Sequence, residues 1–168
     1  NDGNINEVLR SLRVHGQGSD KYDNVRIGIN GRLDTFQAAI LLAKFEIFPE
    51  EIGLRQGVAD DYNELLADVV ATPQVPEGYK SAWAQYSILA RGVAERAAFM
   101  AKLKGAGIPT AIYYPKPLHL QTAFASSGYR EGDFPISEDC AQRIFSLPMH
   151  PYLAAEGRRR IADVLRGK

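Results

Sequence analysis

Two polar side chains, Asn30 and Arg32, stand in a loop with two glycines, directly before a strongly apolar segment. Asp34 can cap the helix predicted to begin there, and Gln37, three residues later, completes a capping-box pattern. The glycines allow positive φ or a close approach to a ligand. Backbone N–H groups and the helix dipole favour anions at such a helix start. The pattern indicates a phosphate or carboxylate site over residues 26–34; a capped loop with solvated polar residues is the alternative.

A second group of candidate side chains surrounds two prolines: Tyr113, Tyr114, Lys116 and His119. Prolines fix the local backbone, and rigid turns hold side chains as accurately as a binding site requires. A packed aromatic strand end with an exposed lysine and a hydrogen-bonded histidine is the alternative interpretation. On a predicted strand, Gln85 shares a face with Trp83, where it lines the core or contacts a ligand.

The composition argues against several classes of function. Twenty basic residues balance twenty acidic ones, so nothing points to nucleic acid or an anionic membrane surface. The three histidines lack metal-ligand spacing, and no P-loop, nucleophile elbow or Rossmann glycine pattern occurs. The single cysteine, Cys140, fits a reducing compartment, and no apolar run reaches transmembrane length. We therefore expect a cytoplasmic protein without a metal site.

The elements that position these residues follow from the spacing of apolar side chains. The segment 34–47 is apolar on nearly all sides, so its helix must be buried by a second domain or a second subunit. Pro49 is expected to break that helix and to begin a bridging helix over 49–68. Residues 1–70 are thus predicted to form a helical arm and an interface segment.

Beyond residue 70 the pattern changes to alternating strands and helices, which predicts a small α/β domain over 71–168. The predicted strands cover 82–90, 110–114 and 147–152. The predicted helices cover 93–104, 137–145 and 154–166.

Five motifs occur in an order that is similar to one family of enzymes. They are His15-Gly-Gln-Gly18, Ile27-Gly-Ile-Asn-Gly-Arg-Leu-Asp34 with Gln37-Ala-Ala-Ile40, Gly107-Ile-Pro-Thr110, Tyr113-Tyr-Pro115 with Pro117-Leu-His119, and Ser146-Leu-Pro-Met-His-Pro151. Over nearly the whole chain the sequence resembles the DegT/DnrJ/EryC1/StrS family of pyridoxal-phosphate-dependent nucleotide-sugar aminotransferases. Within that family it most resembles the enzymes that aminate the 3-keto group of UDP-2-acetamido-3-keto-glucuronate.

The resemblance implies the small C-terminal domain of a fold type I enzyme, with pyridoxal 5'-phosphate as cofactor. It also implies a homodimer formed through the helix 34–47, with active sites built from both subunits. Asn30 would reach the cofactor phosphate of the partner's site, and Arg32 would face a sugar carboxylate or diphosphate. The residues implied to line the sugar-nucleotide pocket are Tyr113, Tyr114, His119 and Gln85.

The sequence departs from the family in one respect, because none of its lysines occurs in the motif that forms the Schiff base with the cofactor. In the family that lysine lies in a large N-terminal domain. We therefore expect the C-terminal portion of an aminotransferase, without a catalytic residue of its own and inactive alone. The parent enzyme would move an amino group from glutamate to the keto-sugar, for lipopolysaccharide biosynthesis. The alternatives are a 4-keto-sugar aminotransferase of the same family and a non-catalytic sugar-nucleotide-binding or interaction module.

Overall fold

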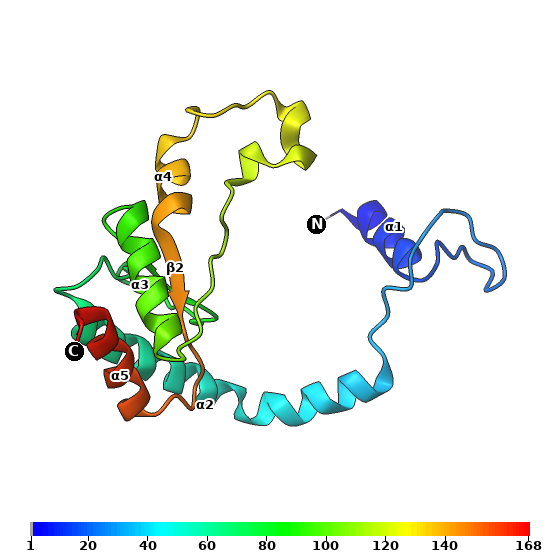
Figure 1. The fold of residues 1–168 in the computed structure, drawn as a ribbon. Coiled ribbons are helices and arrows are strands. Elements are labelled where there is room, and N and C mark those ends of the chain that lie inside the picture. Colours follow the sequence, from blue (N-terminus) through cyan, green and yellow to red (C-terminus); the bar gives the residue numbers. More distant parts are fainter. Residues whose placement is uncertain (1) are drawn as a thin grey trace. The chain divides into compact units, whose positions relative to one another are not determined.

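The structure is a computed structural model that describes residues 2–168, and it divides into two compact units. The first unit ends at Phe48 and the second begins at Pro49. The elements, shown in Figure 1, are α1 (Gly3–Arg13), α2 (Thr35–Leu66), β1 (Tyr86–Leu89), α3 (Val93–Gly105), two 3-10 helices (Leu118–Leu120 and Thr122–Ser127), α4 (Pro135–Arg143), β2 (Ile144–Leu147) and α5 (Ala155–Arg166).

The loop after α1 folds back onto the end of that helix. His15 donates its backbone N–H to Ile29 O at 2.9 Å, and Ile29 N donates to Leu12 O at 2.8 Å. Gly31 N donates to Arg13 O at 2.8 Å, so residues 29–31 run beside the last turn of α1. The two bonds accepted by Leu12 O and Arg13 O satisfy carbonyl groups that the end of a helix otherwise leaves without partners.

Gly28 allows this contact because two backbones meet there. A Cβ built on Gly28 would lie 2.2 Å from Gly16 N and 2.6 Å from Leu12 O. Gly16 has a φ of +79°, and a Cβ there would lie 1.9 Å from Arg26 O. Both glycines therefore serve chain packing at this crossing.

The predicted helix break at Pro49 is wrong, because α2 continues through it to Leu66. Proline removes one intrahelical hydrogen bond, but its φ is close to the helical value, so the turns on either side can continue. The last turns of α2 are held in place by burial of Val58, Tyr62 and Leu66. The residues of the predicted bridging helix pack with the second unit, whereas the predicted domain boundary at residue 70 stays a prediction.

The second unit packs helices around a short sheet, which confirms the predicted small α/β domain with short strands. β1 and β2 pair antiparallel, with Tyr86 opposite Leu147 and Leu89 opposite Ile144. Figure 1 shows α3, α5 and the end of α2 around these strands. The fully buried large side chains of the core are Val58, Tyr62, Leu66, Tyr86, Ile88, Leu103 and Phe145.

Two predicted strands differ from the structure. The segment 110–114 forms only one isolated bridge, between Ala111 and Ser146, instead of a strand. The strand predicted over 147–152 lies earlier, at β2, because Pro148 cannot donate to a ladder and ends it. The helix predicted over 137–145 likewise ends at Arg143. Helices α3 and α5 confirm their predictions to within one residue.

The first half of α2 carries exposed apolar side chains within this chain. Phe36 is 86% exposed and Phe45 is 62% exposed, and Ile40 and Leu42 are similarly open. Burial of this face by a second domain or subunit stays a prediction. In the part of the chain that the structure describes, no helix is both long and apolar enough to cross a membrane.

Candidate functional site

Asn30 and Arg32 lie side by side just before α2. Arg32 Nε donates to Asn30 Oδ1 at 3.1 Å, and both side chains are exposed. Asp34 caps the helix as predicted, because its Oδ1 accepts Gln37 N at 2.9 Å. Its backbone oxygen accepts Ala38 N at 2.9 Å. The capped helix start thus fixes the chain directly after the two polar side chains.

The donors of this pair fit an anion such as a cofactor phosphate. Asn30 Oδ1 is occupied by Arg32, which leaves the Nδ2 amide group of Asn30 as the donor. The terminal guanidinium nitrogens of Arg32 form no ion pair within residues 2–168. An amide and a guanidinium with available N–H groups can bind phosphate or carboxylate oxygens.

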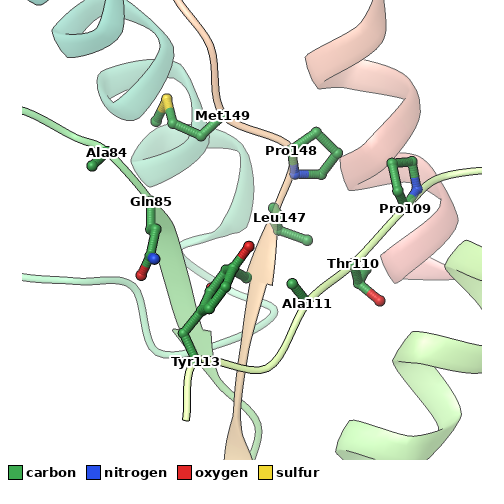
Figure 2. Close-up of a pocket in the computed structure, with 10 residues that line it drawn as sticks. Ala84, Gln85, Pro109, Thr110, Ala111, Tyr113, Leu147, Pro148 and Met149 are labelled. Atoms are coloured by element: carbon green, nitrogen blue, oxygen red, sulfur yellow. The ribbon is translucent and has the colours of Figure 1, made fainter. Parts of the chain in front are cut away.

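In the second unit, Gln85 and Tyr113 line one cavity of about 240 Å³. Figure 2 shows that its walls come from three segments: 84–85 before β1, 109–113 after α3, and the end of β2. Ser146 in this wall is buried, and its Oγ lies 2.7 Å from Ser87 Oγ. The cavity therefore offers the Gln85 amide and the Tyr113 phenol beside a rigid strand.

Tyr113 also lines a second hollow of about 230 Å³, together with Tyr114 and Lys116. The two tyrosine rings meet edge to face, with centroids 6.2 Å apart. Leu118, Ser137 and Cys140 form other parts of this wall. The lysine ammonium gives this hollow a cation that suits an acidic ligand.

His119 lines a third, apolar hollow of about 300 Å³. Its side chain is 9% exposed, and Nε2 lies 2.9 Å from Glu138 Oε1. The imidazole ring also packs on Phe134, with centroids 4.8 Å apart. Glu138 was not among the residues predicted from the sequence. The available signal was an acidic residue in the first turn of a helix that begins with proline.

In the second unit the predicted residues line three hollows, and neighbouring hollows share lining residues. Tyr113 is common to the first and second hollows, whereas Leu118 and Ser137 are common to the second and third. Asn30 and Arg32 belong to the first unit and form a separate pair. Among residues 2–168 no group of acidic, histidine or cysteine side chains could hold a metal ion.

Comparison with known proteins places this fold and these motifs in one class of enzyme. The chain belongs to the DegT/DnrJ/EryC1/StrS aminotransferase family, whose model matches residues 1–166. Aminotransferases of this family depend on pyridoxal phosphate. The chain is 44% identical over 154 residues to UDP-2-acetamido-2-deoxy-3-oxo-D-glucuronate aminotransferase of Pseudomonas aeruginosa. That alignment covers 91% of this chain and 41% of the relative.

Two solved structures support the same assignment. A DegT/DnrJ/EryC1/StrS aminotransferase from Brucella abortus is 50% identical with a TM-score of 0.86, covering 99% of this chain and 44% of that chain. NtdA from Bacillus subtilis, with bound cofactor PMP, is 26% identical with a TM-score of 0.79, covering 94% of this chain and 38% of that chain. The chain thus spans less than half the length of these relatives.

Proposed function

We propose that this chain is part of a pyridoxal-phosphate-dependent aminotransferase that aminates the nucleotide-linked keto-sugar UDP-2-acetamido-3-keto-glucuronate, with glutamate as donor. The observation that carries the proposal is the exposed Asn30–Arg32 pair, joined at 3.1 Å before the capped start of α2. Family membership and the 44% identity to an aminotransferase of a 3-oxo-glucuronate support it. The proposed setting is lipopolysaccharide or surface polysaccharide biosynthesis in the cytoplasm.

The pair divides two binding tasks. The Asn30 amide donates to the cofactor phosphate, and the cofactor, when bound, carries the amino group between donor and keto-sugar. The Arg32 guanidinium binds the sugar carboxylate with two parallel hydrogen bonds. In the same proposal, Gln85, Tyr113, Tyr114 and His119 contact the sugar nucleotide.

A homodimer completes the proposed site. The apolar side chains of the helix 34–47, among them Phe36 and Phe45, are exposed in this chain, and a second copy would bury them. Asn30 and Arg32 would then act in the active site of the partner subunit. Light scattering of the chain is the direct measurement, and a monodisperse monomer would contradict this part of the proposal.

We expect none of the lysines in this chain to form the Schiff base with the cofactor. We expect no stoichiometric lysine adduct when the 168-residue chain is reduced with borohydride in the presence of pyridoxal phosphate. Peptide mass spectrometry of the reduced chain reads the result. A single lysine labelled at full stoichiometry would show that the chain carries its own cofactor lysine.

The decisive experiment for the substrate compares Arg32→Ala with the unchanged full-length enzyme on two substrates. One is the 3-keto-uronate, and the other is the same nucleotide sugar with a hydroxymethyl group in place of the carboxylate. Each charge-assisted hydrogen bond contributes about 1.5–3 kcal/mol, and the loss of one of the two sets the smallest effect to expect. We therefore expect kcat/KM for the uronate to fall about 10- to 150-fold, with little change for the neutral sugar.

Two further variants complete this experiment. Arg32→Lys keeps the charge without the planar fork and should recover only part of the loss. Arg10→Ala is the control, because Arg10 Nε bonds Asn6 Oδ1 on α1 at 3.3 Å, outside the proposed site. Full activity of Arg32→Ala on the uronate would refute the carboxylate role and favour a 4-keto-sugar substrate.

A further inference from the structure

Four hydrogen bonds from three donor groups converge on the carboxylate of Glu138. Gly132 N lies 2.9 Å from Oε1 and 3.0 Å from Oε2, and Phe134 N lies 3.3 Å from Oε1. His119 Nε2 lies 2.9 Å from the same Oε1. One side chain of α4 thus ties together the first 3-10 helix, the turn before α4 and the helix itself.

The charge state of Glu138 determines what His119 does in this contact. The N–H of Gly132 first, and then the hydrogen bond from His119, hold the pKa of Glu138 below its usual range. An ionised carboxylate only accepts hydrogen bonds, so Nε2 of His119 must carry a proton. In the neutral imidazole Nδ1 then carries no proton and is an acceptor. The hydrogen bond at Nε2 thus determines the tautomer of the ring.

Packing fixes the ring in this orientation. The Glu138 side chain is 14% exposed, so the contact is largely shielded from water. Phe134 covers the imidazole at a centroid distance of 4.8 Å and is itself packed on Tyr129 at 5.0 Å. Nearby carboxylates have other partners: Asp133 accepts Arg130 N at 2.9 Å, and Asp139 pairs with Arg143.

We propose that Glu138 is a positioning residue, which holds Nε2–H of His119 toward α4 so that Nδ1 of the neutral imidazole is presented as an acceptor to the nucleotide sugar. Nδ1 accepts a hydrogen bond from a hydroxyl or N–H group of that ligand. The ligand contact rests on the proposed function. The orientation of the ring rests only on the contacts to Glu138 and Phe134.

The orientation is tested by NMR on the 168-residue chain, without substrate or cofactor. The protein has three histidines, so the variant His119→Gln assigns the ring signals of His119. A ring N–H bonded to a shielded carboxylate exchanges slowly, and we expect one observable ring N–H signal, from His119. Glu138→Gln should speed the exchange of this N–H and weaken its signal, because three donor groups then compete for the two lone pairs of one neutral amide oxygen.

Asp139→Asn is the matched control. It neutralises the adjacent carboxylate of α4, which faces Arg143 instead, and should leave the ring signal in place. The amide spectrum of each variant reports whether the chain is folded. A Glu138→Gln variant that folds and keeps the His119 signal at its original exchange rate would overturn the proposal, and so would an unchanged chain in which His119 shows no such signal.

The ligand contact is tested separately by a double-mutant cycle in the full-length aminotransferase. If Glu138 acts through His119, Glu138→Gln should raise KM about tenfold with a smaller effect on kcat, the loss expected for one hydrogen bond. In the His119→Gln background the same change should add less than twofold. Equal effects in both backgrounds would show that Glu138 acts on the ligand by another route. An enzyme that turns over no keto-sugar would refute the proposed function and leave the NMR result standing.

Discussion

Gly28→Ala tests how the loop that carries Asn30 and Arg32 is held. The new Cβ would lie 2.2 Å from Gly16 N and 2.6 Å from both His15 C and Leu12 O. All three are backbone atoms, so no side-chain rotation can relieve the contact. The loop segment around residue 28 must therefore move away from the end of α1.

The cost can be worked from the bonds that this movement breaks. They join His15 to Ile29 at 2.9 Å, Ile29 to Leu12 at 2.8 Å and Gly31 to Arg13 at 2.8 Å. A backbone hydrogen bond contributes about 1 kcal/mol net, so the three together hold the loop by roughly 3 kcal/mol. Because about 1.4 kcal/mol is a factor of ten, the loop should open about 100-fold more often.

Hydrogen exchange with mass spectrometry measures this opening directly. Amides of residues 12–31 should exchange about 100-fold faster in Gly28→Ala than in the unchanged chain. Gly53→Ala is the control: its Cβ meets no heavy atom within 4 Å, and alanine favours a helix by about 1 kcal/mol over glycine. Exchange of residues 12–31 at the original rate in Gly28→Ala would refute the close-packing argument.

Two further predictions concern single groups. Burial raises the pKa of Tyr62 well above its ordinary value of 10.0, because it disfavours the charged phenolate. The neutral phenol therefore contributes its full stabilisation below pH 10, and this contribution is lost as the pH rises toward the pKa of the folded state. Tyr62→Phe should lower the free energy of unfolding by about 1 kcal/mol at neutral pH, through the lost hydrogen bond to Pro148 O. Urea unfolding of the variant should also show a smaller loss of stability at alkaline pH. An equal dependence of stability on alkaline pH in both proteins would contradict this. Asp34→Ala should cost about 1 kcal/mol of helix stability and speed exchange in the first turn of α2. Asp60→Ala, an exposed position in the last third of the same helix, should change stability by less than about 0.5 kcal/mol, and equal effects of the two variants would contradict the cap.

Local signals explain which elements the sequence predicted correctly. The cap at Asp34 and the bounds of α3 and α5 depend on residues within one or two helical turns, so they are visible in the chain itself. Pro49 shows the limit of such signals, since proline usually marks a helix start, yet here the chain continues as one helix. The strand predicted over 110–114 failed because pairing depends on a partner, and only Ala111 meets β2.

In the candidate site, too, contacts between residues near in sequence were predictable, whereas contacts between distant residues were not. Asn30 and Arg32 are neighbours in sequence and in space, so their pairing could be anticipated. The partner of His119 could not, because Glu138 lies 19 residues away. Trp83 was predicted to share a strand face with Gln85. Instead it precedes β1, and its Nε1 donates to Gln56 Oε1 of α2 at 2.8 Å, a contact across 27 residues.

Trp83 gives the protein an optical probe of one unit. It is the only tryptophan in the sequence and belongs to the unit that begins at Pro49. The indole is 5% exposed and lies 5.7 Å from the ring of Tyr86, so its emission will shift when that core opens. Fluorescence therefore reports on the second unit alone, whereas exchange of residues 12–31 reports on the first. Denaturation curves from the two signals will coincide if the units unfold together and separate if each unfolds by itself.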